Sequence, residues 1–324
     1  MQKFKSVKDI LRTLHDEKSC REFLEDIRWN GTPKCPHCDT ESATHYRLTR
    51  NGEFHGKYKC RHCRKTFTVT VGTMFEGTHI PLYDWFYAII QFLTHTKGIS
   101  SVQLSKDLGI TQKTAWSMLH KIRCNLMEDP LNLINSFNGV VQVDETYVGG
   151  KTKGKIWQNQ GRSLKQKVPV VGLLTEEKVA AFVTENVSAN TLQGIICALV
   201  VPGSIVVTDG LKSYTGLAEL YRHEVVEHNK GSYKNKQGFH TNGIEGFWSQ
   251  FKRGLKSTYH SVSRKYLQRY CNEFAFRYSN RTLHSVQVLT KFLQSNTSHI
   301  KRTALSFKTK IETNLPLPGS FRIG

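Results

Sequence analysis

Three acidic residues in the second half of this 324-residue chain are the ones best suited to do chemistry. Asp144 and Asp209 each end a short β-branched run, and such runs predict buried strands that carry the carboxylate at their tip. Glu245 opens an amphipathic helix. Acidic side chains gathered from distant positions bind divalent metal ions, and paired metal ions promote in-line displacement at phosphate. The pattern predicts a phosphoryl-transfer site, with cutting or joining of nucleic acid as the leading interpretation.

The helix that carries Glu245 offers two further candidates. Its apolar stripe consists of Ile244, Trp248, Phe251 and Leu255. Lys252 follows Glu245 by seven residues, so the two side chains lie almost in line, and a lysine there can reach phosphate. A solvated pair on an amphipathic helix would give the same pattern. Asn242, three residues before Glu245, is also a possible metal or substrate ligand, and the spacing does not choose between them.

Glu145 directly follows Asp144 in the sequence. Successive side chains of an extended strand point to opposite faces of the sheet. We therefore expect Glu145 to point away from Asp144, and we rank it well below Asp144 as a metal ligand.

The charge of the chain favours a polyanionic partner. It has 46 Lys+Arg against 26 Asp+Glu, a formal net charge of +20. A basic enzyme whose surplus charge serves solubility is the alternative. The basic stretch at 151–167 lacks periodicity and predicts a loop. Candidate phosphate contacts are Lys151 and Lys153 in that loop, with Lys252 and Arg253 on the later helix.

Cysteine usage and hydropathy indicate a cytoplasmic protein with no membrane partner. No run of eighteen apolar residues occurs, and the first residues lack the apolar segment of a signal peptide. Four of the eight cysteines form two C-x-x-C pairs, and the others are scattered singly. This usage is typical of metal ligands and buried free thiols in a reducing compartment.

The two C-x-x-C pairs predict a zinc ribbon. Cys35, Cys38, Cys60 and Cys63 form two knuckles separated by 21 residues, and four thiolates complete a tetrahedral site for one structural Zn²⁺. Neighbouring strands are expected at 43–49, 57–60 and 66–71. His37 or His62 in place of one thiolate is the weaker alternative. A redox role is weaker still, because no thioredoxin-like pattern surrounds either pair.

A helix-turn-helix is expected after the ribbon. A helix over 81–94 precedes Gly98, and a second helix containing Val102, Leu104 and Leu108 ends at Gly109. Thr111 is a typical N-cap for a third helix, whose inward residues are Ala115, Met118, Leu119 and Ile122. Its outward residues near the N-terminus, where recognition helices meet base edges, are Gln112, Lys113, Thr114 and Ser117. A plain helical hairpin between two domains is the alternative.

From residue 138 onward the pattern changes to short strands and predicts an RNase H-like order, three meander strands followed by α/β alternation. Strands are expected at 139–143, 168–174, 179–184, 204–208 and 224–228, and helices at 190–200 and 214–221. The fold class is α+β multidomain. The expected parts are an N-terminal helical segment (1–30), the zinc ribbon (31–78), the helix-turn-helix domain (79–130), an RNase H-like catalytic domain (136–296) and a C-terminal arm (297–324).

These motifs, taken in order, resemble one known family. The carrying segments are the two knuckles, 98–101, 112–123, 143–151, 208–210, 240–249 and 269–278, within a likeness that spans roughly residues 15–290. The chain resembles the DDE transposases of bacterial insertion sequences, in the group with an N-terminal zinc ribbon that is related to Merlin elements. The resemblance implies Asp144, Asp209 and Glu245 as ligands of two Mg²⁺ or Mn²⁺ ions, with Lys252 as the downstream lysine. The group's third position is Asn or Glu, so Asn242 stays in question.

The resemblance also implies a reaction and its partners. Cleavage frees a 3′-OH at each element end, and this group attacks target DNA directly, without ATP or a covalent protein intermediate. Double-stranded DNA is the partner, and a homodimer or higher synaptic multimer pairs the two ends. One competing interpretation is a catalytically silent domesticated transposase that binds DNA as a regulator. Another is an RNase H-like nuclease acting on RNA or DNA junctions.

Overall fold

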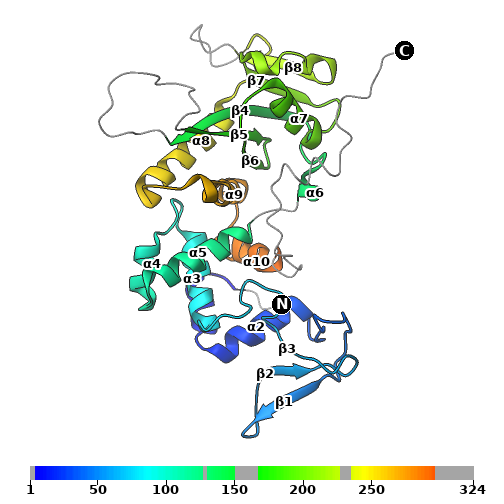
Figure 1. Ribbon diagram of the computed structural model, residues 1–324, viewed down its shortest axis with the longest axis vertical. Coiled ribbons are helices and arrows are strands. Elements are labelled where there is room, and N and C mark those ends of the chain that lie inside the picture. The colour runs from blue at the N-terminus through cyan, green and yellow to red at the C-terminus, as the bar shows by residue number, and fades with distance from the viewer. Residues whose placement is uncertain (1–3, 127–129, 150–166, 227–234, 296–324) are drawn as a thin grey trace. The chain divides into compact units, whose positions relative to one another are not determined.

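The computed structural model describes residues 4–126, 130–149, 167–226 and 235–295 (Figure 1). Contacts divide these residues into two compact units. One unit takes the residues up to Asn125 together with the last helix, and the other runs from Leu126 to Arg281. No helix among the described residues is long and apolar enough to cross a membrane. Lys151 and Lys153 lie outside the described residues.

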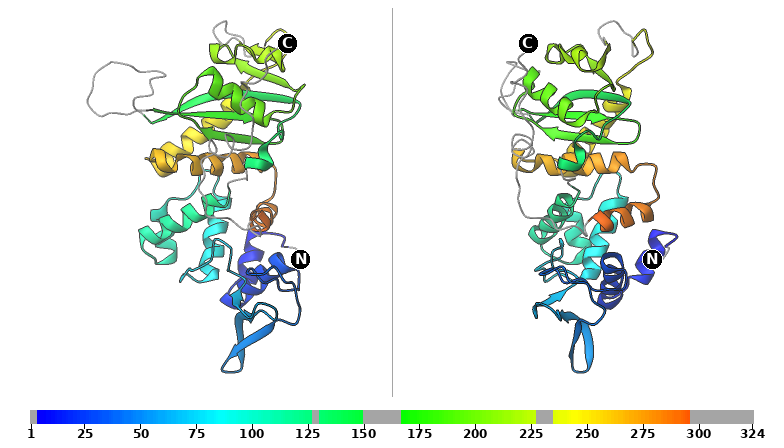
Figure 2. Two further views of the ribbon diagram at one scale, coloured as in Figure 1. Left: turned by 45° about the vertical axis from the view of Figure 1, so that its right-hand side comes forward. Right: turned by 90° about the vertical axis from the view of Figure 1, so that its right-hand side faces the viewer.

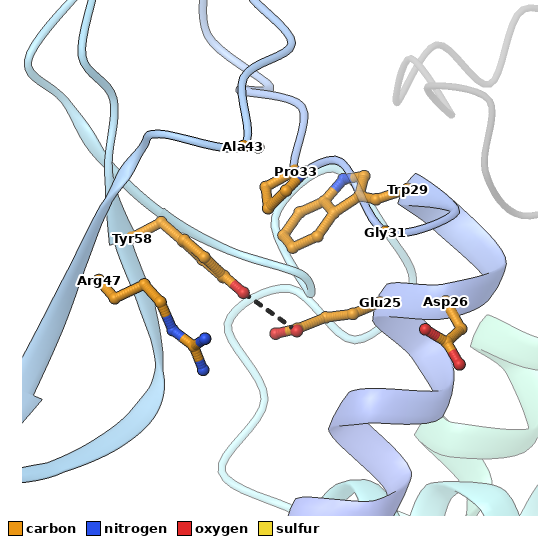
Figure 3. A pocket seen from close by; sticks show the side chains of 8 residues that line it. All are labelled: Glu25, Asp26, Trp29, Gly31, Pro33, Ala43, Arg47 and Tyr58. Carbon is orange, nitrogen blue, oxygen red and sulfur yellow. Dashed lines mark hydrogen bonds between the residues drawn. The ribbon is translucent and has the colours of Figure 1, made fainter.

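The first unit begins with two helices and a small antiparallel sheet. Helices α1 (Val7–Thr13) and α2 (Glu17–Trp29) precede strands β1 (Tyr46–Arg50), β2 (Glu53–Lys59) and β3 (Thr66–Thr68), which pair in the order β1-β2-β3. Trp29 packs edge-on against Tyr58 and Phe67, so one sheet face is fixed to α2. Trp29 and Tyr58 also line a pocket of about 240 Å³, where the Tyr58 hydroxyl donates to Glu25 at 3.1 Å (Figure 3).

Four helices complete this unit: α3 (Leu82–Thr94), α4 (Ser101–Leu108), α5 (Gln112–Cys124) and α10 (Ser285–Ser295). Gly109 ends α4 in the left-handed conformation, and the Thr111 hydroxyl accepts from the Thr114 amide at 3.2 Å, which confirms the expected N-cap. The four expected inward residues of α5 are buried. Val102, expected among the apolar residues of α4, is instead 53% exposed. Helix α10 contacts α2 and α3, so it groups with this unit.

The second unit is built on a five-stranded mixed sheet in the order β6-β5-β4-β7-β8. Its strands are β4 (Val140–Gly149), β5 (Lys167–Leu174), β6 (Val179–Val183), β7 (Ile205–Asp209) and β8 (Arg222–Val226). Neighbours β4, β5 and β6 pair antiparallel, whereas β7 runs parallel to β4 and to β8. The predicted three-stranded meander is confirmed, and two parallel strands follow it. The helix expected at 214–221 is wrong, because two short 3₁₀ turns, η1 (Lys212–Tyr214) and η2 (Leu217–Glu219), occupy that segment.

Helices cover both faces of this sheet. Helix α7 (Ala189–Leu199) shares a buried core with Val141, Val143 and Val206 on one face, and the short α6 (Pro130–Leu133) adds Leu133 to it. The other face buries α8 (Asn242–Gly254) and α9 (Leu267–Ser279). Between them lie a π-helical turn, η4 (Leu255–Tyr259), and a 3₁₀ turn, η5 (Arg264–Tyr266). Figure 2 shows α7 and the α8–α9 pair on opposite sides of the strands.

Glycine at position 172 lets α8 approach the sheet. Gly172 lies in β5 directly opposite Asp144 in β4. A Cβ at Gly172 would lie 2.6 Å from the Trp248 ring and 3.0 Å from Ile244. The buried stripe of α8 therefore rests on bare backbone at this point.

We expect Gly172→Ala to lower the melting temperature of the second unit by several degrees, because the new methyl group forces the Trp248 ring or the strand to move. Gly194→Ala is the matched control. Gly194 lies within α7, and a Cβ there meets nothing within 4 Å, so this variant should gain about 0.5–1 kcal/mol from improved helix propensity. Scanning calorimetry measures both, and equal melting temperatures for the two variants would contradict the close packing.

Candidate active site and zinc cluster

The strand register brings Asp144 and Asp209 together. In the parallel pair, Val140 lies beside Ile205 and Gln142 beside Val207, so Asp144 is level with Asp209 two residues further on. Side chains two residues apart share a sheet face. Both carboxylates therefore face the side covered by α8, where the Trp248 indole N–H donates to Asp144 Oδ2 at 3.0 Å. The Asp209 carboxylate accepts from the Leu211 amide at 3.0 Å.

Glu145 joins this pair, contrary to the expectation that it points away. Ligand oxygens of Asp144, Glu145 and Asp209 all lie within 4.8 Å of one another. Glu145 does leave the opposite face of β4, but β4 and β7 pair only as far as Gln142, whereas pairing with β5 continues to Gly149. Past that point no strand among the described residues pairs with this edge of β4, so side chains from both faces can reach toward the end of β7. Strand alternation alone therefore does not keep Glu145 away from Asp144 and Asp209, and Glu145 is a third candidate metal ligand.

Burial and like charge dominate the electrostatics of this group. Partial burial, with Glu145 and Asp209 nearby, raises the pKa of Asp144 to about 7. The Glu145 amide and the Trp248 indole oppose this shift by donating hydrogen bonds. Three carboxylates so close repel one another, and hard oxygen ligands in this number suit Mg²⁺ or Mn²⁺. The residues present therefore fit a divalent cation site.

The four predicted residues of α8 lie on its exposed side. Asn242 and Glu245 occupy the first turn, and the Thr241 hydroxyl donates to Glu245 at 3.0 Å. Lys252 and Arg253 lie in the last turn, where Arg253 Nε donates to the Ser249 carbonyl. Glu245 is not part of the three-carboxylate group, although it lies one turn before Trp248, which contacts Asp144.

The four knuckle cysteines form one cluster. Their sulfur atoms lie within 4.8 Å of one another, with Cys35–Cys63 at 3.7 Å and Cys38–Cys60 at 3.6 Å. A tetrahedron of sulfurs about 2.3 Å from a central zinc has edges of about 3.8 Å, so the cluster fits Zn²⁺. His37 instead contacts the Thr66 carbonyl at 3.2 Å.

His45 joins the two knuckles, a role that the sequence did not reveal. Its Nδ1 accepts from the Arg61 amide in the second knuckle at 3.2 Å, and its Nε2 lies 3.1 Å from the Thr40 carbonyl after the first. The Thr40 carbonyl also accepts from the Cys35 amide. The buried ring thus accepts through Nδ1 and donates through Nε2, and it connects the two loops. No spacing rule marks this histidine.

The candidate DNA-reading residues lie together at the start of α5. Gln112, Lys113 and Ser117 are exposed, while Thr114 is partly buried at the cap. Gln112 donates to the Ser101 hydroxyl of α4 at 2.7 Å, which ties the two helices together.

Two features define the class of this protein. One is a ribbon with four clustered cysteines, and the other is a mixed α/β domain whose three neighbouring carboxylates suit a divalent metal ion. Residues 15–66 match the transposase zinc-ribbon domain, and residues 136–279 match the ISXO2-like transposase domain. The chain therefore contains a transposase zinc-ribbon domain followed by an ISXO2-like transposase domain.

Curated relatives extend the likeness along the chain. A protein in the transposable element ISH50 of Halobacterium salinarum is 27% identical over 282 residues, 82% of this chain and 92% of that protein. A transposase-like protein of Haemophilus influenzae is 30% identical over 121 residues, 37% of this chain and 96% of that protein.

Two solved structures of the Mos1 transposase also match. The pre-cleavage transpososome has 13% identity and a TM-score of 0.26, covering 62% of this chain and 75% of that chain. The paired-end complex with left transposon end has 15% identity and a TM-score of 0.22, covering 56% and 72%. Scores this low add nothing to the geometry described above.

We expect Asp144→Asn to stabilise the Mg²⁺-free protein increasingly as pH rises. The raised pKa means that the folded protein holds a proton that the unfolded chain releases from about pH 4 upward, so wild-type stability falls between about pH 4 and 7. The variant removes this loss, and its melting temperature should exceed that of wild type by several degrees at pH 8 and by little at pH 4.5.

The exposed Glu219→Gln, in the same unit, is the control for loss of one carboxylate. Melting temperatures are measured in Mg²⁺-free buffer without chelator, so that zinc is retained. A difference between Asp144→Asn and wild type that is constant with pH would contradict the buried carboxylate group.

Proposed function

We propose that this protein is a DDE transposase that binds the terminal inverted repeats of an insertion sequence and catalyses metal-dependent DNA strand cleavage and strand transfer. The observation that carries the proposal is the convergence of Asp144, Glu145 and Asp209 at the end of parallel strands in a chain of net charge +20. The strand order, three in meander followed by two parallel, supports an RNase H-like catalytic domain.

In this mechanism Asp144 and Asp209 would hold the cations together with Glu145 beside them, and α8 would supply the third residue of the DDE triad. Two Mg²⁺ or Mn²⁺ ions held there would supply Lewis-acid activation of the attacking oxygen and stabilisation of the leaving 3′ oxygen. Glu245 and Asn242, both exposed on the first turn of α8, remain the two candidates for that third position. Lys252 and Arg253 on the last turn contact DNA phosphates.

DNA binding is assigned to the first unit. Helices α4 and α5 form a helix-turn-helix whose α5 N-terminus meets base edges in the major groove. The ribbon contributes the outer face of its sheet, where Tyr46 lies opposite Lys59 and Leu48 opposite Lys57. Both lysines are exposed, and neither forms an ion pair with a described acidic residue, so they suit a phosphate backbone. A homodimer or higher multimer pairs two element ends.

A catalytically silent, domesticated transposase that binds DNA as a regulator is the second candidate. A +20 chain with a ribbon and paired helices would serve such a role equally well. Against it stands the cost of holding three carboxylates within 4.8 Å, which a protein without catalysis has no chemical reason to maintain.

The deciding experiment is strand cleavage of a labelled duplex that carries the inverted repeat flanking the coding sequence, with Mg²⁺ or Mn²⁺. We expect metal-dependent nicking at the element boundary in wild type, and its loss in Asp144→Asn with end binding nearly intact. Glu245→Gln and Asn242→Ala assign the third ligand, because only the true ligand's variant should lose about 100-fold or more in rate. Specific binding without nicking by wild type would favour the regulator.

Recognition of the DNA sequence by the N-terminus of α5 can be tested by substitution. We expect Gln112→Ala to weaken binding to the element end about 5- to 100-fold while leaving binding to a random duplex unchanged, because an amide contact to a base edge carries sequence information. Lys113→Ala should weaken binding to both duplexes and reduce the salt dependence by about one phosphate contact. Lys8→Ala, exposed on α1, is the charge-matched control. Uniform loss in Gln112→Ala would contradict base reading, as measured by fluorescence anisotropy.

A further inference from the structure

The two neighbouring carboxylates of the site are each held by a hydrogen-bond donor from a different face of the sheet. Trp248 on α8 donates its indole N–H to Asp144 Oδ2 at 3.0 Å. Tyr214 on η1 donates its hydroxyl to Glu145 Oε2 at 3.1 Å. Both donors are buried, with Trp248 4% and Tyr214 1% exposed. We propose that Tyr214 and Trp248 are positioning residues for the divalent cation site, an inference that rests on the metal-dependent function proposed above.

The need for such donors follows from like-charge repulsion. Carboxylates within 4.8 Å of one another would turn apart by side-chain rotation, and β4 is open at this edge. Hydrogen bonds to charged acceptors are stronger than neutral ones and fix the direction of the accepting oxygen. An indole N–H is a donor only, so Trp248 always presents a proton to Asp144. Residues that orient metal ligands typically change cation affinity 10- to 100-fold when removed.

The surroundings hold Tyr214 rigidly. Gln193 on α7 donates to the carbonyls of Ser213, at 3.1 Å, and Thr215, at 2.7 Å, on either side of Tyr214. The Ser213 hydroxyl donates to the Val187 carbonyl at 2.7 Å.

Trp248 is fixed in a comparable way from the other face. Its ring lies against the bare backbone of Gly172, the residue paired with Asp144. One turn earlier, the Ile244 amide donates to the Gln142 side chain at 3.0 Å, which anchors the start of α8 to β4. The donor therefore reaches Asp144 only because helix and strand approach closely here.

The test measures Mn²⁺ affinity of the full chain by electron paramagnetic resonance of free Mn²⁺, which reports the cation site without DNA. Tyr214→Phe and Trp248→Phe each remove a donor and keep an aromatic ring. Tyr221→Phe is the matched tyrosine control, because its buried hydroxyl donates to the Val200 carbonyl in the same core. Trp85→Phe in the first unit, whose indole donates to Thr78, is the matched tryptophan control.

We expect each site variant to bind Mn²⁺ about tenfold or more weakly, and both controls to bind as wild type does. Nicking by the site variants should need more Mg²⁺ and recover at saturating Mg²⁺, a result that general loss of folding would not give. Unchanged Mn²⁺ affinity in both site variants, or equal loss in the controls, would overturn the inference. Weakened Mn²⁺ binding in the site variants with no nicking by wild type would instead reject the proposed function and leave this inference standing.

Discussion

Repulsion among three carboxylates within 4.8 Å of one another is the constraint on which the second unit depends. The sheet creates it, because β4 and β7 part after Gln142 and leave an open edge that side chains reach from both faces. Burial, together with repulsion from Glu145 and Asp209, raises the pKa of Asp144 in the absence of a cation. A bound divalent cation would offset this repulsion and stabilise the group.

Hydrogen-bond donors from the segments on both faces of the sheet stabilise these carboxylates. Helix α8 brings an indole donor to Asp144 across Gly172, and η1 brings a hydroxyl donor to Glu145 from the side of α7. Each donor belongs to a buried core cluster, so the packing that stabilises the unit also orients these two carboxylates. The packing of the two core clusters therefore also determines the geometry of the site.

In the first unit, the small three-stranded sheet is stabilised by contacts beyond its own strands. Four thiolates and the bridging imidazole of His45 join its two loops, and Trp29 of α2 packs on its inner face. The outer face of the sheet carries exposed lysine side chains. One face of the sheet is thus fixed by packing, and the other face is available to a polyanion.

Local chemistry in the sequence determined the cysteine cluster, the Thr111 cap, the strands that carry Asp144 and Asp209, and the apolar stripe of α8. These depend on spacing, propensity and period, which neighbouring residues encode. Tertiary structure alone decided that Glu145 joins the carboxylates, because the alternation of side chains along a strand does not show where pairing with the neighbouring strand ends. It also decided that Tyr214 lies in a 3₁₀ turn, that Val102 is exposed, that His45 joins the two cysteine loops, and that Trp248 donates to Asp144. These outcomes depend on contacts between residues up to 104 positions apart, which no local pattern records.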